Sequence, residues 1–379
     1  MILKKKSLLD NFIKNKIDFF TGVPDSLLSD FSKELEYKNN KIKHIITPNE
    51  GNALALASGA FIANKKINVV YLQNSGLGNI INPFLSLVHK NIWNIPLFLV
   101  IGWRGNPHNK DEPQHIPQGK ITIKLLKSLK IKYEIISENK DQFKIIKNLK
   151  DYALKNSAPV ALIFTKKYTS PHKSLSIKSE SKNNAMKRIE AIDEILKHTK
   201  KNDIIIATTG KTARELYLLR QRKNLISNDL YVVGGMGHAS SIGLGIMENI
   251  VNRRIFLLDG DGAMLMHMGI LSLLGVQKNN TFFHLLLNNS CHDSVGGQPT
   301  SIINIDMKYL SKAFKYKSYA ELKTKRSINS YFLKFKNKKV SHLLNIKISK
   351  GSEINLPRPK ECPKMNLNAF RKVVNYKDK

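Results

Sequence analysis

Cysteine is scarce in this chain of 379 residues, and long apolar runs are missing. The two cysteines, Cys291 and Cys362, are too few for a disulfide framework and fit no metal-ligand spacing, which indicates a reducing compartment. No segment approaches the roughly 18 consecutive apolar residues that a membrane span needs, and the lysine-rich start is unlike a signal peptide. We therefore expect a cytoplasmic protein with no membrane partner.

Acidic side chains are also scarce, because 29 Asp and Glu stand against 62 Lys and Arg, which gives a formal net charge of +33. Such a charge would ordinarily suggest nucleic-acid binding. However, the lysines are spread over every predicted helix and loop, with no basic tail and no aromatic-interleaved strand face. A compositional bias toward Lys, Asn and Ile explains the charge more simply, so we expect no nucleic-acid partner. The charge still favours the approach of a polyanionic substrate.

The chain does contain two successive stretches in which helical and strand patterns alternate, residues 1–165 and 186–379. Between them, residues 166–185 lose the apolar pattern and are rich in Lys and Ser, as expected of an interdomain linker. The run Pro96–Gly102 is almost continuously apolar, which fits the centre of a parallel sheet covered on both faces. With right-handed crossovers, the pattern predicts an α/β fold of two doubly wound parallel-sheet domains.

Two apolar strands predicted in the second half, Ile255–Leu258 and Phe282–Leu287, end in polar motifs. The first strand is followed by DGDG (259–262) and the second by Asn288-Asn289. Because the carboxyl ends of parallel strands meet at one edge of a sheet, we expect these motifs to lie close together. A GDG sequence by itself is as readily explained as a tight turn. The presence of Asn288-Asn289 after a second strand makes a ligand-binding site the more specific interpretation.

The residue types at this edge suit a divalent cation and a diphosphate. The Asp261 carboxylate, the Asn289 amide oxygen and the Cys291 backbone carbonyl are three oxygen ligands, which leave room for a diphosphate and a water around Mg²⁺. Gly260 and Gly262 let the backbone approach the diphosphate closely, and the next helix directs N–H groups toward it. The motifs therefore predict a magnesium-diphosphate site.

Six further loops carry glycine or polar clusters after a predicted strand. They are Thr21–Ser26, Pro48–Asn52, Gln73–Asn79, Trp103–Gly119, Thr208–Lys211 and Gly234–Ser241.

Several residues in these loops also have an ordinary structural interpretation. Asp25 can cap a helix, Glu50 can favour a helix dipole, and Met236 can fill a core, although its place between glycines argues against that. The loop Trp103–Gly119 is long for a connector inside a compact domain and carries DEPQH (111–115), for which a solvated loop tip is the alternative interpretation.

Taken together, these stretches resemble thiamine-diphosphate-dependent 2-oxoacid decarboxylases, and more narrowly the phosphonopyruvate decarboxylases. The resemblance covers nearly the whole chain and is weakest in the linker and over 327–345. We expect no third domain, such as the larger pyruvate-type enzymes have, between the two halves. The segments that carry the resemblance are GVPDSLL from Gly22, NEG from Asn49, QNSGLGN from Gln73, IGWRG from Ile101, DEPQH from Asp111, TTGKT from Thr208, GGMGHASSIGLG from Gly234, GDG from Gly260, NN from Asn288 and HDSVGGQPT from His292.

The resemblance implies a pyrimidine-binding domain, a diphosphate-binding domain, and the cofactors thiamine diphosphate and Mg²⁺. It implies decarboxylation of 3-phosphonopyruvate to phosphonoacetaldehyde and CO₂, in phosphonate biosynthesis, with the cofactor as the electron sink. One alternative is a sulfopyruvate decarboxylase, since a sulfonate and a phosphonate are both tetrahedral oxyanions. Another is a non-catalytic subunit of the same fold, but such a subunit would be expected to lack Glu50 or the GDG and NN motifs, and both are present.

The resemblance also assigns roles to individual residues. Glu50 would bind N1′ of the aminopyrimidine, the Gly234 carbonyl would accept from its 4′-amino group, and Met236 would hold the cofactor bent. The metal ligands would be Asp261, Asn289 and the backbone carbonyl of Cys291. The cofactor-binding set is Glu50, Asn74, Thr209, Gly210, Gly234, Met236, Gly260, Asp261, Gly262 and Asn289, and the catalytic set is Glu50, Asp25, His115, His292 and Asp293, with Gln114 near the substrate.

The resemblance further implies an assembly. We expect a homodimer, or a dimer of dimers, with active sites at the subunit interface, where Glu50 of one chain faces Gly234–Cys291 of its partner. The small-residue helix after Glu50 is consistent with a tightly packed interface. A small anionic 2-oxoacid is the expected substrate.

Overall fold

Two compact units make up the chain, Met1–Lys178 with Val295–Gln298, and Ser179–Ser294 with Pro299–Lys379. The computed structural model describes residues 7–37, 41–136, 141–171, 185–225, 229–278, 280–335 and 339–375. Most of the predicted linker lies outside the described residues, so the predicted domain boundaries stay a prediction. Among the described helices, none combines the length and apolar character that crossing a membrane requires.

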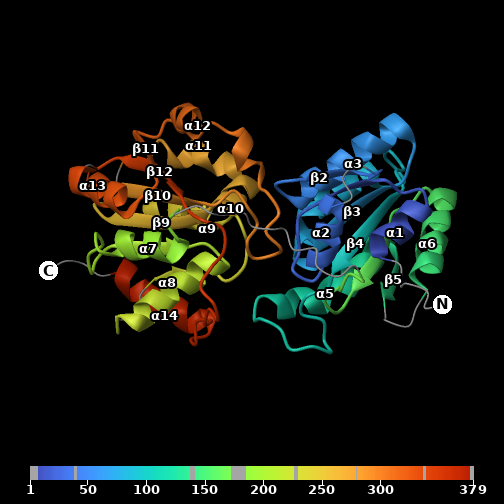
Figure 1. Ribbon diagram of the computed structural model, residues 1–379, viewed down its shortest axis with the longest axis horizontal. Helices are drawn as coiled ribbons and strands as arrows, with labels where there is room; N and C mark the ends of the chain where they lie inside the picture. Colours follow the sequence, from blue (N-terminus) through green and yellow to red (C-terminus); the bar gives the residue numbers. More distant parts are fainter. Residues whose placement is uncertain are drawn as a thin grey trace. The chain divides into compact units, whose positions relative to one another are not determined.

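The first unit is built on one sheet of six parallel strands in the order β2-β1-β3-β4-β6-β5 (Figure 1). The strands are β1 (Phe19–Gly22), β2 (Lys43–Ile46), β3 (Asn68–Gln73), β4 (Leu97–Gly102), β5 (Lys132–Ile136) and β6 (Val160–Phe164). The helices that connect them are α1 (Leu8–Lys14), α2 (Ser29–Tyr37), α3 (Glu50–Asn64), α4 (Leu77–Pro83), α5 (His115–Ser128) and α6 (Gln142–Asn156).

The second unit repeats this architecture with the parallel strand order β11-β12-β10-β9-β7-β8. The strands are β7 (Ile204–Ala207), β8 (Leu230–Tyr231), β9 (Arg254–Gly260), β10 (Thr281–Asn288), β11 (Ser318–Leu322) and β12 (Ser341–Lys347). The helices are α7 (Arg188–Leu196), α8 (Lys211–Arg222), α9 (Ala239–Met247), α10 (Asp261–Met266), α11 (Leu271–Leu274), α12 (Met307–Ala313), α13 (Lys325–Phe335) and α14 (Pro363–Val374). The predicted fold of two doubly wound parallel sheets is confirmed.

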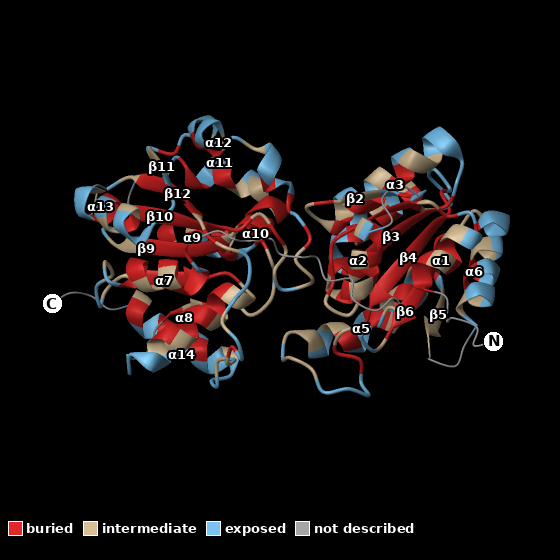
Figure 2. Cartoon of the chain, viewed as in Figure 1, coloured by how far each residue is buried: buried red, intermediate tan, exposed pale blue. Residues whose placement is uncertain are grey.

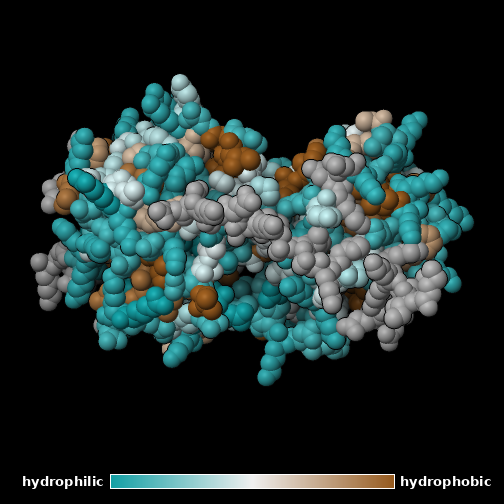
Figure 3. Space-filling model, viewed as in Figure 1, coloured by the Kyte–Doolittle hydropathy of each residue, from teal (hydrophilic) through white to brown (hydrophobic). Residues whose placement is uncertain are grey.

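The central strands are buried on both faces, as their apolar sequences predict (Figure 2). In β4, Phe98 and Val100 pack into one apolar cluster of the first unit, whereas Leu99 and Ile101 pack into the other. This division follows from the two-residue period of a strand, which directs successive side chains to opposite faces. β10 divides its side chains in the same way between the two clusters of the second unit. The surface drawn in Figure 3 is largely hydrophilic, as expected from the excess of lysine.

The loop predicted over Trp103–Gly119 is shorter than expected, because α5 begins at His115 and the loop ends at Gln114. Pro117 belongs to the predicted loop, yet it lies in the first turn of α5. The backbone N–H groups of a first helical turn have no partner within the helix, so a proline there removes no hydrogen bond. The sequence pattern therefore overestimated the loop by its last five residues, 115–119.

Tyr168, which follows β6, ties the end of the first unit to its first two helices. Its hydroxyl accepts a hydrogen bond from the backbone N–H of Leu8 at 2.8 Å and donates one to Glu34 Oε1 at 3.1 Å. Its own backbone N–H donates to the carbonyl of Leu27 at 2.8 Å. Burial raises the pKa of both Glu34 and Tyr168. The first residues of the predicted linker are therefore part of the first unit.

We expect Tyr168→Phe to destabilise the protein by about 1–3 kcal/mol, because the change leaves the Leu8 N–H and a Glu34 oxygen buried without this partner. The measurement is the midpoint of urea unfolding at unchanged slope. Tyr37→Phe is the matched control, since Tyr37 is 77% exposed and its loss of a hydroxyl should be nearly neutral. Equal midpoints for the two variants would show that the hydroxyl of Tyr168 does not stabilise the fold.

Candidate active site

The predicted site residues of each unit lie at the carboxyl-terminal edge of its own sheet. In the first unit they follow β1, β2, β3 and β4, and in the second they follow β7, β8, β9 and β10. This is the edge at which doubly wound sheets bind ligands, because helix starts and loops converge there. The roles of the individual residues stay predictions.

Glu50 is the first residue of α3 and is buried. Its Oε2 accepts a hydrogen bond from Asn79 Nδ2 at 2.7 Å. Its Oε1 lies so close to Gly76 that a Cβ on that glycine would stand 2.4 Å away. Both neighbours belong to the QNSGLGN segment, so that segment orients one carboxylate oxygen through Asn79 and makes room for the other at Gly76.

Asn74 directly follows β3 and is buried, and its amide forms hydrogen bonds with the backbone of Arg104. Its Nδ2 donates to the carbonyl of Arg104 at 3.0 Å and to Thr122 Oγ1 at 2.9 Å, while its Oδ1 accepts from the Arg104 N–H at 2.9 Å. Both amide hydrogens are used. Asn74 thus holds Arg104, the second residue of the loop after β4, in place, and its Oδ1 keeps one lone pair for a ligand.

Asp25 follows β1 and is 1% exposed. Its Oδ2 accepts from the backbone N–H of Leu27 at 2.9 Å and of Leu28 at 3.3 Å, which lie in the turn before α2, so Asp25 closes this turn instead of capping the helix itself. Its Oδ1 is buried and has no hydrogen-bond partner among the described residues. Burial raises the pKa of Asp25 to about 6, although the nearby Arg104 opposes the shift. A carboxyl with a pKa near 6 can exist in both protonation states near neutral pH, as proton transfer requires.

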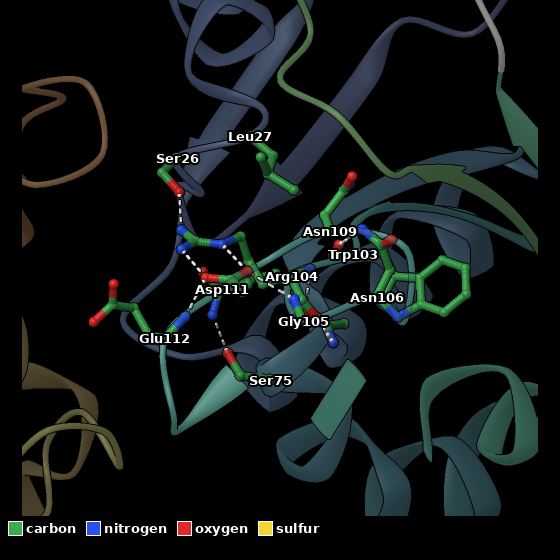
Figure 4. Close-up of polar contacts among 12 residues, drawn as sticks. Ser26, Leu27, Ser75, Trp103, Arg104, Gly105, Asn106, Asn109, Asp111 and Glu112 are labelled. Carbon is green, nitrogen blue, oxygen red and sulfur yellow. Dashed lines mark hydrogen bonds and ion pairs between the residues drawn. The ribbon is translucent and has the colours of Figure 1, made fainter. Parts of the chain in front are cut away.

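Arg104 organises the loop after β4, and sequence reasoning did not single it out. Its Nε and Nη2 donate to the two oxygens of Asp111 at 2.8 and 2.5 Å, and its Nη1 donates to Ser26 Oγ at 2.9 Å. Figure 4 shows the guanidinium between Ser26 and Asp111. Asp111 also accepts from the backbone N–H of Gly105 at 2.7 Å. The pair therefore joins the loops after β1 and β4, and the pKa of Asp111 is lowered by its hydrogen bonds to Arg104 and Gly105 although burial opposes this.

His115 is the first residue of α5 and is half-buried. Burial and the positive charge of Arg104 lower its pKa, whereas Asp111 opposes the change. Gln114 precedes it as the helix cap residue and is also half-buried. The structure thus places His115 beside the Arg104–Asp111 pair, on a helix end rather than on a free loop.

In the second unit, Asp261 is the first residue of α10 and is 4% exposed. Thr300 Oγ1 donates to its Oδ2 at 2.7 Å. Burial raises the pKa of Asp261 to about 6, against the effect of this hydrogen bond. Thr300 comes from the HDSVGGQPT segment and lies 39 residues beyond Asp261 in the sequence.

Asn289 follows β10 and is 8% exposed. Its Nδ2 donates to Asp293 Oδ2 at 2.6 Å, and its Oδ1 accepts from the backbone N–H of Cys291 at 3.1 Å. Asp293 also accepts from Cys291 Sγ at 3.2 Å, from the Gly351 N–H at 3.2 Å, and from Arg188 Nη2 at 2.6 Å. Sequence reasoning missed Arg188, because it lies 105 residues away on α7 in a segment without a motif.

His292 lies against the second glycine of the GDG motif. A Cβ on Gly262 would stand 3.0 Å from the His292 ring. Burial lowers the pKa of His292 to about 4, so its neutral form is favoured near neutral pH. The absence of a side chain at Gly262 therefore makes room for this ring.

Asp259, the first residue of the DGDG motif, belongs to a buried polar chain that sequence reasoning also missed. Its Oδ2 contacts His284 Nε2 at 3.2 Å and accepts from Ser240 Oγ at 3.1 Å, and His284 Nδ1 lies 3.0 Å from the Tyr316 hydroxyl. The available signal was the single histidine inside the apolar strand FFHLLL, since a buried polar group needs a partner. These hydrogen-bonded side chains connect β9 and β10 with α9 and with the segment before β11.

The remaining predicted cofactor-binding residues lie in the loops after β7 and β8. Thr209 Oγ1 donates to the Val233 carbonyl at 3.0 Å, which joins the two loops. Gly210 caps α8 with a φ of 92°, a conformation that favours glycine. Half-buried Met236 follows Gly234 and stands between glycines of positive φ. Met236 is a member of neither apolar cluster of the second unit.

The donor set at the second edge fits a divalent cation bound together with a diphosphate. Asp261 and Asn289 have oxygen lone pairs beyond those used above, and Gly260 has no atom within 4 Å of the place of a Cβ. Within the described ranges, no group of three or more His, Cys, Asp or Glu is arranged as a metal site. The predicted ligand set has only one acidic side chain, so it does not require such a group, and Mg²⁺ stays a prediction.

The chain matches two family models, both of which describe cofactor-binding domains. "Thiamine pyrophosphate enzyme, N-terminal TPP binding domain" matches residues 5–126, and "Thiamine pyrophosphate enzyme, C-terminal TPP binding domain" matches residues 206–337. The two matches fall on the first and the second unit.

Curated relatives match along nearly the whole chain. Phosphonopyruvate decarboxylase of Streptomyces viridochromogenes is 30% identical over 93% of this chain and 90% of its own length. The protein of the same name from Streptomyces hygroscopicus is 28% identical over 93% and 89%. Sulfopyruvate decarboxylase of Methanosarcina acetivorans is 26% identical over 86% and 87%. The chain therefore belongs to the family of thiamine-pyrophosphate-dependent decarboxylases, within the group of carboxy-lyases that includes the phosphonopyruvate decarboxylases.

Proposed function

We propose that this protein converts 3-phosphonopyruvate to phosphonoacetaldehyde and CO₂, with thiamine diphosphate and Mg²⁺, in phosphonate biosynthesis. The observation that carries the proposal is the 30% identity to a phosphonopyruvate decarboxylase along 93% of the chain. The predicted cofactor residues support it, because they lie at the carboxyl-terminal edges of the two sheets.

The second unit would bind the diphosphate end of the cofactor. Asp261, the Asn289 amide oxygen and the Cys291 carbonyl would hold Mg²⁺, and Gly260, where no atom lies within 4 Å of the place of a Cβ, would let the diphosphate approach the backbone. Thr300 keeps the Asp261 carboxylate oriented through its 2.7 Å hydrogen bond. The bound cofactor would supply the electron sink that stabilises charge as CO₂ leaves.

The first unit would act on the other end of the cofactor and on the substrate. Glu50 Oε1 would exchange a proton with the pyrimidine ring, while Asn79 holds Oε2. Asp25 and His115 are the candidates for proton transfer to the product carbon, since both lie near Arg104 and both have shifted pKa values. The guanidinium of Arg104 and the net charge of +33 would favour an anionic 2-oxoacid.

A sulfopyruvate decarboxylase is the second candidate function, because the relative from Methanosarcina acetivorans is 26% identical over 86% of the chain. The higher identity to two phosphonopyruvate decarboxylases favours the phosphonate substrate. A non-catalytic subunit is less consistent with the retained Glu50, Asp261 and Asn289. We further propose a cytoplasmic homodimer or dimer of dimers with active sites at the subunit interface.

We expect the purified protein to release CO₂ from 3-phosphonopyruvate with a kcat/KM at least about tenfold above that for sulfopyruvate or pyruvate, since each 1.4 kcal/mol of differential transition-state binding gives a factor of ten. A coupled assay of CO₂ release with the three substrates side by side measures this. Reactions without Mg²⁺ and without thiamine diphosphate are the controls. A preference for sulfopyruvate would replace the proposed substrate, and no turnover of any of the three would contradict the proposal.

We expect Glu50→Gln to retain cofactor affinity while slowing exchange of the cofactor C2 proton by about 100-fold or more. Asn79 donates to the side chain at 50, so it would attract the glutamine oxygen and leave the NH₂ group facing the pyrimidine, where it can bond but cannot transfer a proton. Exchange is followed by NMR after acid quench, and affinity by calorimetry. Glu361→Gln at an exposed site is the control. Normal exchange in Glu50→Gln would show that Glu50 does not activate the cofactor and only interacts with the dipole of α3.

We expect two inactive variants, Glu50→Gln and Asp261→Ala, to restore each other's activity when they are co-expressed. If each site combines Glu50 of one chain with Asp261 of its partner, a mixed dimer has one intact site, and random mixing gives about a quarter of the wild-type activity. CO₂ release by the co-purified mixture measures this, and each variant alone is the control. An inactive mixture whose mixed dimers are verified by mass spectrometry would place both residues of a site on one chain.

A further inference from the structure

The side-chain amide of Asn289 lies between two groups of fixed hydrogen-bonding character. Its Nδ2 is 2.6 Å from Asp293 Oδ2, and its Oδ1 is 3.1 Å from the backbone nitrogen of Cys291. A carboxylate only accepts hydrogen bonds and a peptide N–H only donates. Turning the amide over would place oxygen against oxygen at Asp293 and donor against donor at Cys291. Two neighbours therefore determine which way the amide oxygen of Asn289 points.

Asp293 is itself held in place by groups from two other parts of the second unit. Arg188 Nη2, at the start of α7, donates to its Oδ2 at 2.6 Å, and the N–H of Gly351, after β12, lies 3.2 Å from both of its oxygens. Arg188 is 6% exposed and has Glu215 of α8 3.6 Å from its Nη1. Such charge-assisted contacts are shorter and stronger than neutral ones. With Asn289 and Cys291, Asp293 thus receives four donors.

We propose that Asp293 is a positioning residue, which turns the amide oxygen of Asn289 toward the divalent cation, and that Arg188 holds Asp293 for this task. The inference rests on the proposed function, in which Asn289 is a ligand of Mg²⁺. The Asn289 oxygen uses one lone pair for the Cys291 N–H and keeps the other for the cation. Because Mg²⁺ requires near-octahedral oxygen ligation, an amide that presents its nitrogen no longer provides a ligand.

This role differs from the catalytic role that the sequence suggested for Asp293, and the two make opposite predictions for one conservative variant. In Asp293→Asn, the amide oxygen can take the place of Oδ2 and still accept from both Arg188 and Asn289. A positioning residue would therefore tolerate Asn. A residue that carries a proton would not, because an amide cannot take one up.

The first experiment measures the Mg²⁺ dependence of thiamine diphosphate binding by calorimetry, without substrate. We expect Asp293→Leu, which has no acceptor, to weaken the apparent Mg²⁺ affinity about 10–100-fold, as loss of a group that orients a metal ligand typically does. Asp293→Asn should stay within about threefold of the wild type on the same scale. Asp261→Ala, which removes a direct ligand, provides the upper limit of the effect.

Asp293→Leu leaves Arg188 buried without its closest partner, so the double variant Arg188→Met/Asp293→Leu is tested beside it. Replacing both members of a buried ion pair by apolar residues is often tolerated, whereas removing one is not. Because Arg188 also lies 3.6 Å from Glu215, folding of the double variant is verified by its urea unfolding midpoint. The folded double variant should show the same loss of Mg²⁺ affinity. The matched control is Arg220→Met/Asp229→Leu, which removes an ion pair with two 2.9 Å hydrogen bonds. Asp229 directly precedes β8, so this pair lies at the amino-terminal ends of the strands, away from the predicted metal site.

The outcomes separate the inference from the function on which it rests. If wild-type binding of thiamine diphosphate does not depend on Mg²⁺, the proposed metal site is wrong. If the wild type depends on Mg²⁺ but the double variant keeps its affinity, the positioning role is wrong. Normal Mg²⁺ affinity together with loss of turnover in Asp293→Asn would return Asp293 to catalysis. The inference is supported if Asp293→Leu and Arg188→Met/Asp293→Leu lose Mg²⁺ affinity while Asp293→Asn keeps it.

Discussion

Burial of both faces of each parallel sheet is the constraint on which the rest of this structure depends. β4 and β10 have buried residues along their whole length, so their faces have no place for a solvated polar group. Polar chemistry is thereby confined to the ends of the strands, where helix starts and loops provide hydrogen-bond partners. Every predicted site residue lies at or just beyond such an end, or opens the helix that follows it, and the same packing that stabilises the fold collects these residues at one edge of each sheet.

The two edges differ in how their carboxylates are satisfied. In the second unit, Asp259 and Asp293 are each surrounded by donors from several elements, which makes a rigid frame suited to binding. In the first unit, Asp25 keeps one buried oxygen without a partner, and burial raises its pKa to about 6. A carboxyl in that state is suited to gaining and losing a proton. Burial raises the pKa of Asp261 in the second unit to about 6 as well, so the two edges differ in the number of donors around their carboxylates and not in the direction of the pKa shift.

The sequence predicted most of the fold and the positions of the motifs, because apolar periodicity and strand-end glycines are local signals. It did not predict the helix start at His115, since Pro117 was interpreted as part of a loop. It also missed Arg104 and Arg188, whose partners are decided by which strands are neighbours. Arg188 lies 105 residues from Asp293, and no local pattern encodes that distance. Contacts that hold these loops in shape therefore depend on the three-dimensional arrangement, whereas the motifs are local signals that the sequence shows directly.

The buried pair of Arg188 and Asp293 is not explained by stability alone. Removing two charges from water has a free-energy cost that their attraction offsets only when the geometry is good, and apolar replacements of such pairs are often neutral or stabilising. What an apolar pair cannot provide is an acceptor at a defined point beside Asn289. The 2.6 Å contacts of Asp293 to Arg188 and to Asn289 share one oxygen, so the same atom that neutralises the arginine also orients the amide. The pair is therefore best understood as a device that fixes the orientation of one neighbouring side chain.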